Sequence, residues 1–318
     1  MRRIAVLLSA PLLAVAPLAV AACGSSGPST PSVSVSGSFG KSPTISIPSQ
    51  TAGSNLTVKT LIQGSGPVLS KSDAFVGNYA VYIWSGKTHK LAQSTFQTKT
   101  PQLFSGTLLP GLESALQGKK MGSRVLAVIP PKDGYGKTGN SSAGVSATDT
   151  LVFVIDMIKE FANNAAATGS QVSNGGGSLP TVTAKSGAAP VITIPSSAHK
   201  PPTALVTKTL IKGSGPKLVK GQFVIAQYAG YIWRTKKVFD SSWTSGSPFG
   251  FVMDASPEQV ISGWDSGLVG QTVGSRVMLV IPPKDAYGTS GASQAGINGK
   301  DTLVFVVDII DALKPTTS

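Results

Sequence analysis

The chain has 318 residues, of which 41% are hydrophobic and 13% are charged, and its formal net charge is +13. This length favours two domains, because single hydrophobic cores rarely grow beyond about 250–300 residues. The basic residues are scattered, with no dense run and no interleaved aromatic row, which argues against nucleic-acid binding and favours a solvated surface or attraction to an anionic lipid or wall polymer.

The N-terminus has the features of an export leader. Two arginines follow Met1, and the apolar run after them is long enough for a membrane-spanning helix by length alone. The run ends in the small residues Ala21 and Ala22, directly before Cys23, which is the only cysteine. This ending has the form of a lipobox, so we predict a lipoprotein signal peptide over 1–22 and lipid on Cys23. The alternative is an ordinary signal peptide followed by an incidental cysteine.

A lipid on Cys23 would hold the protein on the extracytoplasmic face of the cell membrane. It would also leave no cysteine for a disulfide within the monomer, so the domains must be stable by packing alone. The residues after Cys23 are rich in Ser, Gly and Pro, and this composition predicts a disordered tether over 23–50.

The chain contains an internal repeat. Residues 129–158 match residues 281–310 at 19 of 30 positions without a gap. We therefore predict one domain over 51–162 and a second over 201–318. Residues 163–200 between them are rich in Ala, Ser, Gly and Pro, which predicts a flexible linker and loosely coupled domains.

Strand patterns dominate each repeat unit. In the second unit, 223–233, 277–281 and 303–310 are rich in β-branched and aromatic residues and predict strands. Ser256, followed by Pro and Glu, predicts the start of a short helix with apolar residues at helical spacing up to Leu268. Several strands and one helix predict an α+β unit in which an antiparallel sheet curls over the helix.

Nothing in the chain predicts metal, nucleotide or nucleophile chemistry. The glycines at 134, 136 and 139 spell a dinucleotide fingerprint, but they do not open a helix after a strand. His89 and His199 fall in an insertion and in the predicted linker, and no Cys/His cluster is present in the sequence. We therefore expect no metal and no cofactor.

Five motifs of the second unit belong together. They are Tyr228-Ala229-Gly230, Val238-Phe239-Asp240-Ser241-Ser242, Pro248-Phe249-Gly250-Phe251, Val260-Ile261-Ser262-Gly263-Trp264, and Ala286-Tyr287-Gly288 with Leu303-Val304-Phe305. With these motifs, residues 204–313 resemble the FKBP-type peptidyl-prolyl cis/trans isomerases. The resemblance implies that each unit is an FKBP-like domain, an antiparallel half-barrel sheet curled around a short helix.

The resemblance also implies a proline pocket. Trp264 would form its floor, and Tyr287 would donate its hydroxyl to a substrate carbonyl. Asp240 would be the polar residue that tunes the field on that carbonyl, and Ile297 would supply an apolar loop contact. The implied walls are Tyr228, Phe239, Phe249, Val260, Ile261 and Phe305. Ser245 and Ala292 depart from the family pattern and leave substrate preference open.

The first unit keeps the scaffold but not the pocket. Ala92 stands in place of Phe239, and Gln93, Gln102 and Leu112 replace Asp240, Phe249 and Trp264. We expect a folded first domain whose pocket is shallow and wetter, with weak or no activity.

The implied function is prolyl isomerisation of exported proteins, mainly by the second domain. The expected partners are Pro-containing polypeptides, with a macrolide of the rapamycin type as a possible inhibitor. A non-catalytic module that binds Pro-containing or unfolded segments is the main alternative, and a surface scaffold is a third.

Overall fold

The computed structural model describes residues 32–185, 187–196 and 200–314. The predicted leader and the predicted lipidation site, Cys23, lie outside the described residues. Within the described ranges, no helix is both long and apolar enough to cross a membrane.

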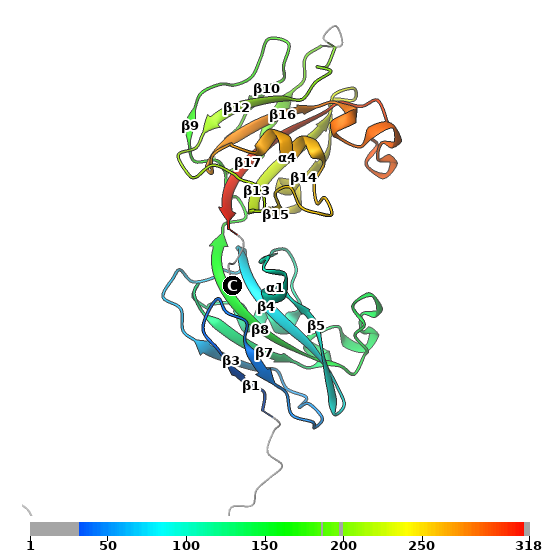
Figure 1. The fold of residues 1–318 in the computed structure, drawn as a ribbon. Coiled ribbons are helices and arrows are strands. Elements are labelled where there is room, and N and C mark those ends of the chain that lie inside the picture. The colour runs from blue at the N-terminus through cyan, green and yellow to red at the C-terminus, as the bar shows by residue number, and fades with distance from the viewer. Residues whose placement is uncertain (1–31, 186, 197–199, 315–318) are drawn as a thin grey trace, which may run out of the picture. The chain divides into compact units, whose positions relative to one another are not determined.

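Domain 1 is built on a six-stranded antiparallel sheet with the order β3-β7-β8-β4-β5, and β6 pairs with β4 (Figure 1). The strands are β3 Thr57–Ile62, β4 Ala74–Ser85, β5 Thr88–Ser94, β6 Gln102–Phe104, β7 Arg124–Ile129 and β8 Thr150–Phe161. The helices are α1 Thr95–Thr98 and α2 Pro110–Leu116, with the 3-10 turns Pro131–Asp133, Gly136–Thr138 and Ser141–Ala143.

Domain 2 repeats this plan with a sheet in the order β14-β13-β17-β16-β12-β9, and β15 pairs with β13. The strands are β9 Ser170–Gln171, β12 Val206–Lys212, β13 Phe223–Ile232, β14 Lys237–Ser241, β15 Phe249–Val252, β16 Arg276–Ile281 and β17 Leu303–Leu313. The helices are α3 Ser242–Ser245 and α4 Ser262–Leu268, with the 3-10 turns Pro283–Asp285, Gly288–Ser290 and Ser293–Ala295. These two sheets, each with one short helix on its inner face, confirm the predicted α+β class.

The predicted helix start at Ser256 is wrong, because α4 begins six residues later. Ile261 is its N-cap residue, with φ −64° and ψ 146°. Residues 256–260 are a loop, and side chains on both sides of the start of α4 accept bonds from the backbone before Ser256. The Gln259 side chain accepts from Val252 at 2.9 Å, and Asp265 accepts from Asp254 at 2.7 Å.

Both faces of the central strands are buried, which explains why β7 and β16 are apolar along most of their length. Side chains alternate between faces along a strand. In β7, Val125 and Ile129 pack towards α2, whereas Leu126 and Val128 belong to a separate cluster on the outer face. An apolar outer face needs a cover.

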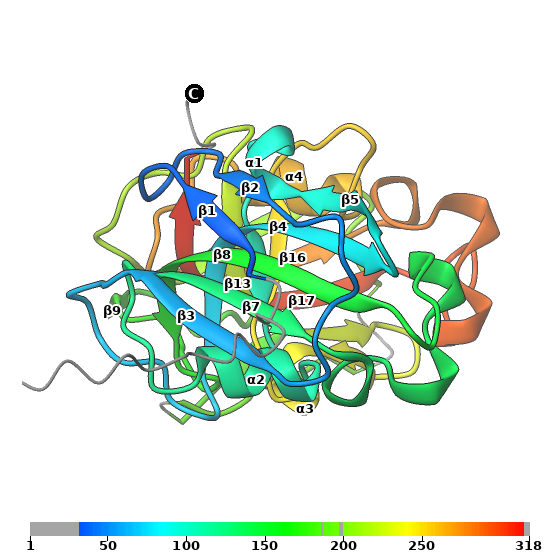
Figure 2. The same ribbon diagram turned by 90° about the horizontal axis from the view of Figure 1, so that it is seen from below.

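A two-stranded hairpin supplies that cover in domain 1. β1 Ser34–Ser36 and β2 Thr44–Ser46 pair antiparallel, and the neighbouring Val33 and Ile47 are buried in one cluster with Trp84 (Figure 2). The prediction of a disordered tether is therefore wrong for residues 32–50. Burial of apolar side chains on the sheet outweighs the polar composition of this segment.

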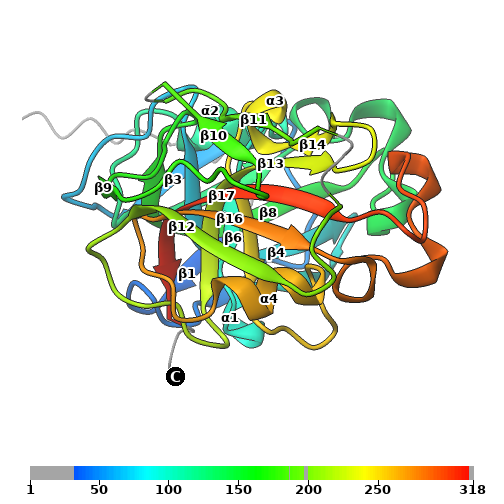
Figure 3. The ribbon, with the colours of Figure 1, turned by 90° about the horizontal axis from the view of Figure 1, so that it is seen from above.

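The segment predicted as a linker is likewise part of domain 2. β10 Thr181–Thr183 and β11 Val191–Thr193 form a hairpin, and Val182 and Ile192 are buried with Trp233 on the outer face (Figure 3). β9 also adds to the sheet edge beside β12. The linker prediction is wrong for these stretches, because their alternating apolar residues find an apolar face.

Buried ion pairs fasten these segments to the sheets. In domain 1, Arg124 and Asp156 lie 2.6 Å apart, and their side chains are almost fully buried. Arg124 also donates to the carbonyl of Gly37 at 3.0 Å, and Asp156 accepts the N–H of Gly40 at 2.6 Å, so the pair ties the hairpin turn to the sheet.

Domain 2 has a buried arginine–aspartate pair at the corresponding place in its sheet. Arg276 and Asp308 lie 2.6 Å apart and are also buried. Asp308 accepts the N–H of Ala167 at 3.0 Å, which fastens the segment before β9.

Candidate functional site

An aromatic cage surrounds Trp264 on the inner face of the domain 2 sheet. Trp264 is 3% exposed, and its ring centroid lies 5.3 Å from Tyr228, 5.5 Å from Phe251 and 5.3 Å from Phe305. The three interplanar angles lie between 75° and 86°. Aromatic rings favour such edge-to-face contacts, so Trp264 is held rigidly as the floor of the site.

The close approach of α4 to the sheet presents this tryptophan. A Cβ on Gly263 would lie 2.5 Å from the Ile281 side chain and 3.0 Å from the carbonyl oxygen of Asp285. Only glycine lets the first turn of α4 lie this near to β16. The turn itself is closed by a hydrogen bond from the Trp264 N–H to the Ile261 carbonyl at 2.8 Å.

Phe239 forms the outer wall on β14. Its ring lies edge-on to Phe305, with a centroid distance of 5.5 Å. It covers Gly230 on the paired strand β13, where a Cβ would lie 2.9 Å from the Phe239 ring and 2.8 Å from the Phe305 ring. The absence of a side chain at Gly230 therefore makes room for Phe239.

A polar pair marks the rim of the cage. The hydroxyl of Tyr228 donates to a carboxylate oxygen of Asp240 at 2.5 Å. Asp240 is solvent-exposed, whereas Tyr228 is half-buried. The bond holds the carboxylate at the edge of the aromatic surface, where a bound peptide would meet it.

Two tyrosine hydroxyls stay protonated in this environment. Burial raises the pKa of Tyr228, and its hydrogen bond to Asp240 raises the pKa further. Burial also raises the pKa of Tyr287, with a smaller contribution from the charge of Asp240. Tyr287 is 40% exposed, so its hydroxyl is accessible as a hydrogen-bond donor.

The structure brings most of the predicted pocket residues together. Phe249 lies 5.7 Å from Tyr228 and 6.2 Å from Trp264, centroid to centroid. Val260 and Ile261 pack on the same core, and Ile297, which is 3% exposed, is one of the buried members of that core.

Two structural residues of the site were not predicted. Phe251 is fully buried against the Trp264 ring, and Gly230 lies beneath Phe239. Phe251 and Gly230 both lie within the motifs described above. The need for a glycine at position 230 becomes visible only when β13 and β14 are seen paired.

Domain 1 has a cavity of about 740 Å³ at the corresponding place. Its lining includes Tyr79, Phe104, Leu112, Phe153 and Tyr135. In this lining, Ala92, Gln102 and Leu112 stand at the positions of Phe239, Phe249 and Trp264, and the expectation of a shallow, wetter pocket stays a prediction.

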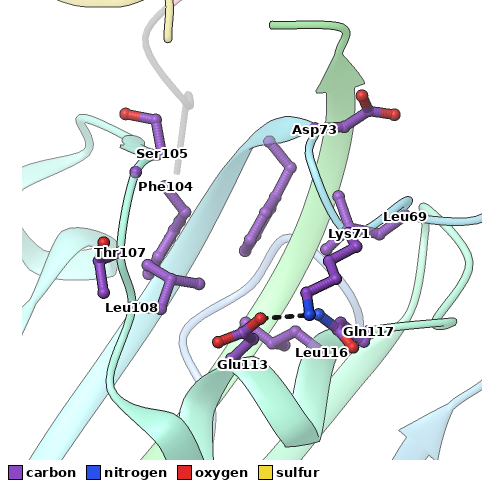
Figure 4. A pocket seen from close by; sticks show the side chains of 12 residues that line it. Leu69, Lys71, Asp73, Phe104, Ser105, Thr107, Leu108, Glu113, Leu116 and Gln117 are labelled. Carbon is purple, nitrogen blue, oxygen red and sulfur yellow. Dashed lines mark hydrogen bonds between the residues drawn. The ribbon is translucent and has the colours of Figure 1, made fainter. Parts of the chain in front are cut away.

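A second, smaller cavity of about 190 Å³ lies beside α2, where Gln117 donates to Glu113 at 2.9 Å (Figure 4). The loop before α2 is five residues shorter than the corresponding loop of domain 2. In the longer loop of domain 2, Met253 is fully buried, and its N–H donates to the carbonyl of Gln222. The residue of domain 1 that corresponds to Gln222 is Asp73, which lines the small cavity. The shorter loop thus leaves space unfilled on this side of the domain.

The comparisons with known proteins agree with this geometry. A family model described as "FKBP-type peptidyl-prolyl cis-trans isomerase" matches residues 69–158 and again residues 215–310. The match confirms the resemblance seen in the second unit and extends it to the first.

Individual relatives match over about one domain. An FK506-binding protein of Streptomyces anulatus is 42% identical over 111 residues, which are 35% of this chain and 88% of that protein. The FKBP-type peptidyl-prolyl cis-trans isomerase FkpA of Escherichia coli is 38% identical over 113 residues, 36% of this chain and 39% of that protein. The crystal structure of FkpA covers 37% of this chain and 52% of its own, at 37% identity and a TM-score of 0.32.

Proposed function

Because the chain belongs to the FKBP-type peptidyl-prolyl cis-trans isomerases, we propose that domain 2 carries its isomerase activity and that its substrates are exported proteins. The observation that carries the first part is the cage around Trp264 with the bonded pair Tyr228 and Asp240 at its rim. Domain 1 has Leu112 and Gln93 at the positions of Trp264 and Asp240.

The reaction needs no nucleophile. Rotation about the X–Pro bond faces a barrier of about 18–20 kcal/mol from amide resonance, and uncatalysed exchange takes tens of seconds or longer. A dry aromatic site disfavours the polar, planar amide relative to the twisted form, in which resonance is lost.

Each group of the site then has a defined task. The Trp264 floor and the rings of Phe239 and Phe305 would receive the proline ring and exclude water. The Tyr287 hydroxyl would donate to a substrate carbonyl, since its raised pKa keeps the proton in place. Asp240, fixed by Tyr228, would set the electrostatic field on the carbonyl that rotates.

A matched pair of conservative variants tests this assignment. Tyr287→Phe removes the proposed donor in domain 2, and Tyr135→Phe removes the corresponding hydroxyl in domain 1. In a protease-coupled prolyl-peptide assay on the full chain, we expect Tyr287→Phe to lower kcat/KM several-fold, as for loss of one hydrogen bond worth about 0.5–1.5 kcal/mol. Tyr135→Phe should leave it unchanged. Equal rates with and without the protein would refute the enzymatic assignment.

Related proteins named for binding FK506 suggest a ligand for the same pocket. We propose that domain 2 binds a macrolide of the FK506 or rapamycin type on the Trp264 floor. Such a compound should inhibit prolyl turnover competitively, and an absence of inhibition would argue against the pocket assignment.

The proposed location is the extracytoplasmic face of the cell membrane, with a lipid on Cys23. The support for it is the apolar run and the small residues before that cysteine. Cys23→Ser should abolish incorporation of labelled palmitate and release the protein from the membrane fraction. Unchanged labelling of the variant would contradict the anchor.

A second function, non-catalytic binding of Pro-containing or unfolded segments, is favoured for domain 1. Its open cavity of about 740 Å³ is of ligand-binding size. However, Ala92, Gln93 and Leu112 stand where domain 2 has Phe239, Asp240 and Trp264, so domain 1 lacks the residues proposed for catalysis.

A further inference from the structure

The cavity of domain 1 keeps aromatic walls around a centre that has no ring. Tyr79 lies edge-on to Phe104, with centroids 5.5 Å apart, and 6.2 Å from Phe153. Leu112, at the position of the domain 2 tryptophan, is 5% exposed and lies at the base of the cavity. The aromatic walls therefore contact one another, and the cavity that they line is open.

In domain 2 the corresponding centre is filled by a ring of the chain itself. The counterparts of the three walls are Tyr228, Phe251 and Phe305, and each contacts the Trp264 ring at 5.3–5.5 Å between centroids. In domain 1, two of the corresponding residues, Tyr79 and Phe104, contact each other directly, so a bound ring would pack against the cavity-lining sides of Tyr79, Phe104 and Phe153.

The outer wall of the domain 1 cavity has been rebuilt by two substitutions that fit each other. Domain 2 has Gly230 beneath Phe239, and a Cβ at this glycine would lie 2.9 Å from that ring. Domain 1 has Val81 in place of the glycine and Ala92 in place of the phenylalanine. The larger side chain is therefore on β4 in domain 1, whereas in domain 2 it is on β14, the strand paired with β13. Val81 is 8% exposed, which shows that it packs as a wall and leaves the cavity open above it.

The polarity of the lining selects among ligands. All the residues that line the cavity are uncharged, and the polar ones include Gln93, Gln102 and Tyr135. Their amide and hydroxyl groups can donate to and accept from a peptide backbone. A charged ligand would find no counter-charge in this lining and would lose hydration on entry.

We propose that domain 1 binds an aromatic side chain of an extended polypeptide, with its ring in the cavity against Tyr79, Phe104 and Phe153. The cavity of about 740 Å³ lies within the range of ligand pockets, about 300–1,000 Å³. A phenylalanine or tryptophan ring would make the edge-to-face contacts that Trp264 makes in domain 2. A proline ring would lack the Trp264 floor and the Phe239 wall, so it would leave gaps and lose dispersion contacts.

This inference rests on the proposed function only in taking unfolded exported proteins as the source of the aromatic segment. Domain 1 would hold a client by an aromatic residue, whereas domain 2 would act on its prolines. The two sites would thus read different residues of the same polypeptide.

Methyl NMR of the full chain tests the site directly. The probes are acetylated and amidated Gly-Ser-Phe-Ser-Gly and the same peptide with Leu or Pro in the centre. We expect the Phe peptide to shift the methyl resonances of Val81, Ala92 and Leu112, with a Kd at least about 10-fold below those of the other two, a difference of about 1.4 kcal/mol. No shift at these methyls, or equal affinity for the Pro or Leu peptide, would overturn the proposal.

A variant that fills the cavity gives an independent readout. Leu112→Trp places in the cavity the ring that domain 2 carries, and we expect it to weaken binding of the Phe peptide at least about 10-fold, again about 1.4 kcal/mol. Prolyl turnover of the same sample should be unchanged, and retained methyl resonances of the domain 1 core residues Val125 and Ile129 would show that domain 1 is folded. Unaltered Phe-peptide binding would refute the site, whereas a lack of turnover in the wild-type chain with intact peptide binding would refute only the proposed isomerase function of domain 2. If Leu112→Trp fails to fold, the comparison of the three peptides on the wild-type chain still decides the matter.

Discussion

Domain 1 and domain 2 share a scaffold and differ in the pocket. Both curl an antiparallel sheet over a short helix, cover the outer face with a hairpin and bury an arginine–aspartate pair. On the inner face, Trp264 fills the centre of one cage, and Leu112 leaves the other open.

The difference teaches that the pocket contributes little to holding the sheet together. The core of domain 1 keeps buried apolar residues at Leu116, Val125 and Ile129 although the rings of Phe239, Phe249 and Trp264 have no counterpart there. The scaffold gains its stability from the sheet, the outer hairpin and the buried pair, so the pocket is free to change. The following changes test that separation, from the largest expected effect to the smallest.

The buried ion pairs should matter equally in both domains. Arg124→Leu or Arg276→Leu leaves a buried aspartate without its partner, which costs about 3–5 kcal/mol. We expect a loss of this size in the free energy of unfolding of the affected domain, measured by urea denaturation of the full chain.

Lys220→Ala is the matched control, because it removes the exposed pair with Asp254 and should cause no measurable change. A loss below about 1 kcal/mol for either arginine variant would show that the pair does not fasten the outer segment.

Gly230→Val should damage the pocket of domain 2 alone. The added side chain would meet the rings of Phe239 and Phe305 at 2.8–2.9 Å. Overpacking of this kind costs about 1–3 kcal/mol, and displacement of Phe239 should lower prolyl turnover about 10–100-fold.

The reverse change in domain 1, Val81→Gly, should leave turnover as it is. If Gly230→Val retains full activity, the position of the Phe239 ring does not depend on the lack of a side chain at residue 230.

Tyr228 should give domain 2 an alkaline signature. Its pKa is raised in the folded chain, so above pH 10 the unfolded state releases the proton first and stability falls as pH rises. Below pH 10 both states hold the proton, and this group adds no slope. Tyr228→Phe should make the slope above pH 10 less steep, as measured by urea midpoints between pH 8 and 11, and the raised pKa of Tyr287 should keep the remainder. An unchanged slope would place the titration elsewhere.

Much of the fold was predictable from residue patterns. The repeat located both domains, and the runs that became β13, β16 and β17 were recognised by their β-branched and aromatic residues. The helix was found, but its start was misplaced, because Ser256 and Pro257 resemble a cap whereas the structure has Ile261 as the N-cap residue.

The outer hairpins were missed because their composition is that of a linker. Their signal lay in the alternation of Val and Ile with Ser and Thr, for example at Ile45-Ser46-Ile47 and Ile192-Thr193-Ile194. Such short strands are stable only on an apolar face, and sequence patterns alone do not reveal that the sheet has a second one.

The aromatic residues around Trp264 were named from the motifs of domain 2, and their role in catalysis stays a prediction, whereas the size of the domain 1 cavity was not predicted. Replacement of Trp by Leu suggested erosion, but the outcome depends on whether neighbours move inward. Here Tyr79 contacts both Phe104 and Phe153, and all three line the cavity.

The most direct test of the account compares one substitution in each domain. Asp240→Ala removes the partner of the Tyr228 hydroxyl, and Gln93→Ala is the same truncation at the matching position of domain 1. In the prolyl-peptide assay on the full chain, the first should lower kcat/KM about 10-fold or more, as for loss of a hydrogen bond to a charged group, and the second should leave it unchanged. A comparable fall for Gln93→Ala, or full activity of Asp240→Ala, would contradict the assignment of catalysis to domain 2.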